Sequence, residues 1–264
     1  MTERYAVVGN PVAHSKSPRI HAQFMRATCQ AMDYGCIEAP LDGFEAAVDT
    51  FRAAGGRGLN VTLPFKGAAF RYCADTSERA KAAQVVNTLV FRDCVFGDNT
   101  DGVGLVRDIE GNLGFPLTGR KLLLMGAGGA ACGVVGALLE AGVAGLVIAN
   151  RTVSKAQALA ARFTGTSASA YDQLVGEFDI VINATSAGMT SEALPLPAGI
   201  VGQSTLAYEM VYGRDTAFLA AARAAGARTS DGLGMLVEQA AESFFLWRGI
   251  RPQTGPVLAE LRAA

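Results

Sequence analysis

The 264-residue chain lacks several features that would assign it to a specialised class of protein. Acidic and basic side chains nearly balance, 24 against 23, which gives a formal net charge of −1. Without an excess of positive charge, the chain offers no polybasic surface to nucleic acid or to an anionic membrane. No apolar stretch reaches membrane-spanning length, and the N-terminus shows no signal-peptide core. These absences predict a soluble, cytoplasmic protein that binds neither nucleic acid nor membrane.

Metal ligands and disulfide partners are also scarce. The five cysteines are scattered and form no C-x-x-C pair, and the two histidines, His14 and His21, have no partner at metal-ligand spacing. We therefore expect no metal site, reduced thiols in the core, and structural roles for both histidines.

Apolar residues and glycine are abundant. Half of the residues are hydrophobic and 31 are glycines, a composition that suits an α/β protein with many tight turns. The chain is long for a single hydrophobic core, so we expect one large domain or two modest ones.

The most informative stretch is K-L-L-L-M-G-A-G-G-A-A at residues 121–131. The apolar run 122–125 predicts a parallel strand that is buried on both faces. Gly126, Gly128 and Ala131 occupy the three small-residue positions of a G-x-G-x-x-G/A motif. These positions serve a tight turn, the approach of a pyrophosphate to the backbone, and close packing of helix on strand. By itself, such a turn also joins strands and helices that bind nothing.

The residues that follow favour a dinucleotide site. The small residues after the glycine turn open a helix that continues over 133–141, and a second short apolar strand over 145–149 completes a β-α-β unit. At the end of that strand, NAD-binding proteins place an acidic residue, whereas this chain has Arg151 and, one turn later, Lys155. A guanidinium can hold a 2′-phosphate through two parallel hydrogen bonds, and a carboxylate would repel it. The predicted cofactor is therefore NADP rather than NAD.

Polar residues follow the predicted strands of the N-terminal half. A strand over 5–8 leads into a loop that carries Ser15 and Ser17, and Pro18 begins a helix. Two hydroxyls beside a helix N-terminus suit a carboxylate ligand, although a helix cap explains Ser17 equally well.

A lysine and an aspartate also follow predicted strands. Lys66 comes directly after a strand over 58–63, at the carboxyl end where open α/β sheets bind ligands, and Asp101 lies in the polar turn 97–102. A lysine beside a carboxylate in a partly dry cleft can donate and accept a proton. The alternatives are an ordinary surface lysine and an aspartate that caps the next helix.

The order of these motifs resembles that of the shikimate dehydrogenase family. S-K-S-P, N-V-T-L-P-F-K, N-T and G-D-N-T-D-G are followed by G-A-G-G-A and N-R-T, and the likeness spans nearly the whole chain. The resemblance implies an α/β fold with a substrate domain over 1–102 and 236–264 and a Rossmann-type, doubly wound NADP domain over 103–235. It also implies reversible reduction of 3-dehydroshikimate to shikimate by NADPH, a step of chorismate and aromatic amino acid biosynthesis.

The resemblance assigns roles to individual residues. Lys66 and Asp101 would form the catalytic acid-base pair. Substrate would contact Ser15, Ser17, Thr62, Lys66, Asn87, Asp101, Tyr212 and Gln239. NADP would contact Glu78, Gly126, Ala127, Gly128, Gly129, Ala130, Asn150, Arg151, Thr152, Lys155, Met210 and Gly232. Glu78 is also explained as the exposed start of a helix, Gln239 as a backbone contact, and the small-residue loop 183–188 as either a cofactor contact or a plain turn.

Two other functions are consistent with the same motifs. One is an NAD-dependent quinate/shikimate dehydrogenase, against which Arg151 and Lys155 argue. The other is a non-catalytic NADP-binding paralogue, against which the intact Lys66 and Asp101 argue. The sequence leaves the oligomeric state open and is compatible with a homodimer.

Overall fold

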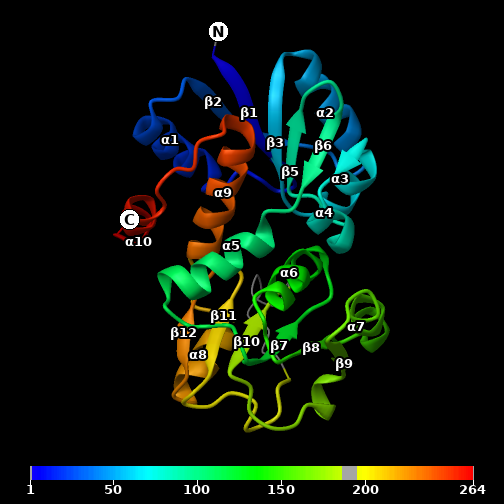
Figure 1. Cartoon of the computed structure of the whole chain (residues 1–264), viewed down its shortest axis with the longest axis vertical. Helices are drawn as coiled ribbons and strands as arrows, with labels where there is room; N and C mark the ends of the chain where they lie inside the picture. Colours follow the sequence, from blue (N-terminus) through cyan, green and yellow to red (C-terminus); the bar gives the residue numbers. More distant parts are fainter. Residues whose placement is uncertain (1, 186–194, 264) are drawn as a thin grey trace. The chain divides into compact units, whose positions relative to one another are not determined.

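The computed structural model describes residues 2–185 and 195–263. The chain divides into two compact units (Figure 1). Unit 1 comprises Met1–Gly104 and Leu236–Ala264, and unit 2 comprises Leu105–Met235. No helix among the described residues is both long enough and apolar enough to span a membrane.

The described residues of unit 1 form a mixed six-stranded sheet. Its strands are β1 (Glu3–Gly9), β2 (Met32–Glu38), β3 (Gly56–Val61), β4 (Asp75–Thr76), β5 (Thr88–Phe91) and β6 (Val95–Asp98). They lie in the order β2-β1-β3-β5-β6-β4. β1 is parallel to β2 and β3, whereas β5 is antiparallel to both β3 and β6. The predicted strand over 5–8 is confirmed as part of β1.

Helices pack on this sheet through apolar stripes. They are α1 (Ser17–Thr28), α2 (Phe44–Ala53), α3 (Lys66–Tyr72), α4 (Glu78–Ala83), α10 (Gly255–Ala263) and, from residue 236 on, α9 (Leu233–Arg248). Phe44, Val48 and Phe51 recur at helical spacing on α2 and join the core that contains Val8. Side chains alternate along a strand, so Tyr5 of β1 points to the other face, where its ring lies 4.8 Å from that of Trp247.

Unit 2 contains a parallel sheet, with six strands in its described part. They are β7 (Lys121–Met125), β8 (Gly145–Ala149), β9 (Thr166–Ser169), β10 (Ile180–Asn183), β11 (Leu206–Glu209) and β12 (Arg228–Ser230). The order is β12-β11-β10-β7-β8-β9, and every neighbouring pair is parallel. This is the doubly wound Rossmann order, in which the winding reverses between β7 and β10.

Both faces of this sheet are buried, which explains the unbroken apolar run in β7. Leu122 and Leu124 pack with Val134 of α6 (Gly129–Glu140), whereas Leu123 packs on the other face with Phe218 of α8 (Ala217–Ala224). The described part of this unit also contains α7 (Val153–Ala160), the 3-10 turn Tyr171–Gln173, and α5 (Asp101–Arg107), which begins in unit 1.

α5 is followed by a π-helical turn at Asp108–Asn112, where the Asn112 amide donates to the Asp108 carboxylate at 2.9 Å. One prediction about local structure needs correction. The cysteines are not core thiols, because three of the five are exposed and two are half-buried, and all five are free. Each exposed cysteine lies at an edge or turn of unit 1, where its neighbours leave it open to solvent.

Candidate active site

Lys66 and Asp101 meet in unit 1. Lys66 begins α3 just after β3, and Asp101 begins α5 just after β6. The Lys66 Nζ lies 2.5 Å from the Asp101 Oδ2, and the two side chains are only 14% and 7% exposed. Burying two charges costs about as much free energy as their attraction returns, so the pair contributes little net stability. Its geometry instead suits a proton donor held by a carboxylate.

The Asp101 carboxylate is not a helix cap. Asp101 is the first residue within α5 rather than the residue before it, and its own backbone N–H donates to the Asn99 side chain at 3.0 Å. The second carboxylate oxygen, Oδ1, accepts from the Asn87 amide at 2.9 Å. Asp101 is therefore held by Lys66 on one oxygen and by Asn87 on the other.

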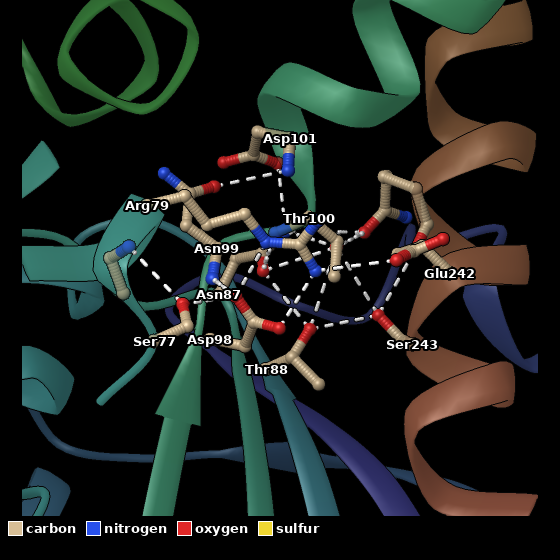
Figure 2. A network of polar contacts seen from close by, with 12 residues as sticks. Ser77, Arg79, Asn87, Thr88, Asp98, Asn99, Thr100, Asp101, Glu242 and Ser243 are labelled. Atoms are coloured by element: carbon tan, nitrogen blue, oxygen red, sulfur yellow. Dashed lines mark hydrogen bonds and ion pairs between the residues drawn. The ribbon is translucent and has the colours of Figure 1, made fainter. Parts of the chain in front are cut away.

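The orientation of the Asn87 amide is fixed by its neighbours, as Figure 2 shows. Its oxygen accepts from the Thr100 backbone N–H at 2.8 Å and from the Thr88 hydroxyl at 3.0 Å. Because the oxygen faces these donors, the NH₂ group must face Asp101. Asn87 is 3% exposed, so its network lies out of solvent.

Gln239 joins this network from α9. Its amide nitrogen donates to the Leu236 carbonyl at 2.8 Å, and its oxygen accepts from Asn87 at 3.3 Å. Gln239 thus makes the backbone contact that was one of its two explanations, and it also contacts Asn87 of the predicted site. One turn later on the same helix, the Ser243 hydroxyl lies 2.8 Å from that of Thr88.

A second chain of hydrogen bonds connects Ser243 with the start of α1. The Asn60 amide donates to Ser243 at 2.9 Å, and the Tyr34 hydroxyl donates to the Asn60 oxygen at 2.7 Å. Burial raises the pKa of Tyr34 well above its ordinary value, which keeps this hydroxyl protonated, while a hydrogen bond with Ser17 acts in the opposite direction.

Ser17 does not occupy the capping position of α1, as the alternative explanation required. The capping position is Lys16, and it has no side-chain cap among the described residues, whereas Ser17 is buried in the first turn. The Ser17 backbone N–H donates to the Ser15 hydroxyl at 3.2 Å. Thr62 is another candidate of this unit, and it is half-buried. It packs against Gly9, because a Cβ added to Gly9 would collide with the Thr62 methyl group.

Glu78 lies on the surface of unit 1. Its side chain is 91% exposed and pairs with Lys81 at 2.8 Å. Ser77 caps α4 by accepting from the Ala80 backbone N–H at 3.2 Å, as expected for a helix start.

The glycine turn of unit 2 has the geometry that a pyrophosphate requires. Gly126 has a φ of +112°, and a Cβ there would lie 2.9 Å from the Ala184 carbonyl oxygen, so only glycine fits. Gly128 is exposed, and within the described chain no atom lies within 4 Å of where its Cβ would be. The N-terminus of α6 also lacks a side-chain cap among the described residues, which leaves backbone N–H groups for an anion. Ala127, Gly129 and Ala130 are partly exposed along the same turn.

Basic side chains lie after β8, where the 2′-phosphate was predicted. Arg151, Thr152 and Lys155 are exposed there, and the Asn150 amide donates to the Thr152 carbonyl at 2.9 Å. Burial raises the pKa of the nearby Tyr171 to about 12, and the charge of Arg151 opposes that rise.

Met210 and Gly232 lie together in unit 2. A Cβ on Gly232 would collide with the Met210 carbonyl, and the Gly232 N–H donates to the Val211 carbonyl at 3.2 Å. Tyr212, two residues after Met210, is half-buried. Of the loop 183–188, residues 186–188 lie outside the described residues.

Sequence reasoning missed the side chains that hold the site together: Asn60, Thr88, Thr100 and Ser243. Ser243 carried one signal, because it lies four residues after Gln239 and therefore on the same helix face. The described residues contain no group of three or more His, Cys, Asp or Glu that could hold a metal ion.

The sheet order and glycine turn define unit 2 as a Rossmann-type dinucleotide-binding fold. Three family models match along the chain: the shikimate dehydrogenase substrate binding domain over 7–89, shikimate / quinate 5-dehydrogenase over 109–191, and the shikimate 5′-dehydrogenase C-terminal domain over 232–262. The chain belongs to the shikimate dehydrogenase family.

Individual relatives are similar over the full length. The shikimate dehydrogenase (NADP(+)) of Methylobacillus flagellatus is 56% identical over 269 residues, which cover 99% of this chain and 100% of the relative. A crystal structure of an Ael1 enzyme from Pseudomonas putida is 51% identical, with a TM-score of 0.94 and 98% of each chain covered. The shikimate 5-dehydrogenase of Thermus thermophilus, in complex with NADP(H) and shikimate, is 35% identical, with a TM-score of 0.89 and 99% of each chain covered.

Proposed function

We propose that this protein catalyses the reversible NADPH-dependent reduction of 3-dehydroshikimate to shikimate. The observation that carries the proposal is the Lys66–Asp101 pair, at 2.5 Å and largely buried, in a family whose members are named for this activity. A fold alone hosts many reactions, so the site rather than the Rossmann sheet supports the assignment.

The proton chemistry is assigned to Lys66. Bound NADPH supplies the hydride, and negative charge then develops on the oxygen of the substrate carbonyl. The Lys66 ammonium stabilises that charge and donates a proton to the oxygen, and in the reverse direction neutral Lys66 accepts the proton from the hydroxyl. Asp101 holds the ammonium in place, and Asn87 prevents the carboxylate from turning away.

Substrate binding is assigned to the polar side chains around that pair. Ser15 and Ser17 stand at the N-terminus of α1, whose first turn has no acidic residue, and a helix N-terminus favours a carboxylate. We assign them to the substrate carboxylate, for which the family resemblance makes Tyr212 a further candidate. The ring hydroxyls would contact Thr62, Asn87 and Gln239, in addition to Lys66 and Asp101.

Cofactor binding is assigned mainly to unit 2. The backbone N–H groups at the glycine turn, from Gly126 to Ala130, would hold the pyrophosphate. Arg151, Thr152 and Lys155, with Asn150, would hold the adenosine ribose and its 2′-phosphate, because exposed cations suit a phosphate dianion. Met210 and Gly232, which pack on each other, and Glu78 of unit 1 are assigned to the nicotinamide half.

A direct assay tests the proposal. The purified protein is mixed with shikimate and NADP⁺, and NADPH formation is followed by absorbance, with quinate and NAD⁺ as alternative substrates. We expect rapid NADPH formation from shikimate and slow reaction with quinate or NAD⁺. If quinate and NAD⁺ are used as rapidly as shikimate and NADP⁺, the result would support the quinate/shikimate dehydrogenase instead. If the protein binds NADPH but oxidises none of the substrates, the result would support a non-catalytic paralogue.

A further inference from the structure

Arg79 makes the most extensive ion contacts near the site. Its Nε donates to Asp98 Oδ1 and its Nη2 to Asp98 Oδ2, each at 2.7 Å, which is the two-pronged geometry of a strong arginine–carboxylate pair. Asp98 ends β6 and is 3% exposed. It also accepts from the Ser77 hydroxyl at 2.5 Å and the Asn99 N–H at 2.7 Å. The buried carboxylate is thus fully satisfied, and Arg79 supplies its countercharge.

A second contact joins Arg79 to α9. Its Nη2 also donates to Glu242 Oε1 at 3.3 Å, and the other oxygen of Glu242 accepts from Arg251 at 2.6 Å. Glu242 is buried and lies three residues after Gln239 and one before Ser243. Figure 2 shows Arg79 between Asp98 and Glu242.

Both carboxylates lie next to proposed site residues. Asp98 directly precedes Asn99, Thr100 and Asp101, and its backbone carbonyl accepts the Asn87 N–H at 3.0 Å. A shift of Asp98 would therefore move Asp101 and Asn87 together. A shift of Glu242 would move Gln239. The hydrogen bond between Asn87 and Gln239 is already long, at 3.3 Å, so a small shift would break it.

We propose that Arg79 is a positioning residue, which clamps the segment 98–101 to α9 and so sets the spacing between Asp101, Asn87 and Gln239. The inference rests on the proposed function, because it assigns these three residues to the site. It adds a residue whose guanidinium makes its hydrogen bonds with Asp98 and Glu242.

The chemistry of the clamp requires arginine. Burial lowers the pKa of Arg79, but the hydrogen bonds and charges of Asp98 and Glu242 outweigh it and raise the pKa above its ordinary value, so the guanidinium stays charged. Its planar fork fixes the direction of the Asp98 carboxylate, which a single lysine ammonium cannot do. The neighbouring Glu78–Lys81 pair, by contrast, is exposed.

Three variants separate the two contacts. Arg79→Lys keeps the charge but loses the fork, and Arg79→Gln removes both the charge and the fork. Glu242→Gln leaves the Arg79–Asp98 contact intact and weakens the contacts of Glu242 with Arg79 and Arg251. Glu260→Gln is the matched control, because it weakens an exposed Arg–Glu pair of the same unit, Arg19–Glu260 at 2.9 Å. For each protein we would measure kcat, KM for shikimate and for NADP⁺, the shikimate Kd by calorimetry, and Tm.

We expect Glu242→Gln to raise the KM and Kd for shikimate by about three- to tenfold with kcat within about twofold, because Gln239 binds substrate and transition state alike. Arg79→Lys should lower kcat by at least about tenfold, since the Lys66–Asp101 geometry is displaced. Arg79→Gln should lower it further, so that lysine gives a partial rescue. The KM for NADP⁺ and all constants of Glu260→Gln should stay at the parent values.

Two results would overturn the inference. The first is that the Arg79→Lys and Glu242→Gln proteins both fold and have the same kcat and the same KM for shikimate as the parent. The other is an equal rise of the KM for shikimate and NADP⁺, which indicates general loosening. If Arg79→Gln does not fold, the other two variants still decide. If the parent protein binds shikimate without oxidising it, the proposed reaction is refuted, but the role of Arg79 can still be tested through the shikimate Kd of the variants. If the parent protein does not bind shikimate, both the proposed reaction and the role of Arg79 are refuted.

Discussion

His21 should make the stability of unit 1 sensitive to acid. Its imidazole is completely buried and stacks on Tyr34, with ring centroids 4.1 Å apart. Neither ring nitrogen has a hydrogen-bond partner among the described residues. Burial therefore lowers the pKa of His21 from 6.5 to about 3, a shift that the nearby Asn60 amide opposes only weakly.

The sign and size of the effect follow from proton linkage. Below pH 6.5 the unfolded chain binds a proton at His21 that the folded chain excludes. The free energy of unfolding is therefore unaffected by this group above pH 6.5, and it falls as the pH drops from 6.5 toward 3. Between about pH 7.5 and about pH 5, this single group should cost about 2 kcal/mol of unfolding free energy. His21→Phe keeps an aromatic ring in the cluster and removes the titration.

The assay is urea unfolding at the two pH values, followed by the fluorescence of Trp247, the sole tryptophan. Its ring lies 5.5 Å from that of His21, so it reports on this unit. The loss of unfolding free energy between the two pH values should be about 2 kcal/mol smaller in His21→Phe than in the parent. His14→Gln, a change at the exposed histidine, is the control and should match the parent. Equal losses in His21→Phe and the parent would refute the reasoning.

Two further predictions concern unit 2. Arg151→Gln should raise the KM for NADP⁺ by at least about tenfold and change the KM for NAD⁺ by less than about threefold, because only NADP⁺ carries the 2′-phosphate; steady-state kinetics with both cofactors decides, and equal changes would contradict the assignment. Gly234→Ala should destabilise the protein by about 1–3 kcal/mol, because its Cβ would collide with the buried Asp108 carboxylate, to which Tyr208 donates at 2.6 Å. An unchanged Tm by calorimetry would show that this packing is looser than the structure indicates.

Regular elements with buried apolar faces were predictable from the sequence. The strand expected over 145–149 is β8, residue for residue, because its apolar run must be covered on both faces. The glycine turn before α6 was predictable because only glycine adopts the backbone of Gly126 at low cost. The helix that the small residues open directly after this turn is α6, which begins at Gly129.

Other strands depend on partners that a local pattern does not reveal. In the apolar segment 85–91, β5 begins only at Thr88, because the backbone N–H groups of Val86 and Asn87 donate to the carbonyls of Lys66 and Asp98. β12 was not predicted, since its three residues, R-T-S, carry no apolar pattern and are held by β11 alone. Tertiary pairing decides both cases.

The polar network of the site shows the same limit. Asn60 and Ser243 are 183 positions apart, and Arg79 and Glu242 are 163 apart, so no spacing in the sequence indicates that they meet. The motifs identified which residues carry chemistry, and the structure identifies the side chains that hold them.

The most direct test of the central claim is the kinetic and binding analysis of Lys66→Ala. Because the lysine proton is needed mainly in the transition state, kcat should fall by about a hundredfold or more while the Kd for shikimate stays within about fivefold. Lys121→Ala, which removes an exposed lysine at the start of β7, should leave both constants unchanged. A folded Lys66→Ala protein with kcat within about threefold of the parent would contradict the account.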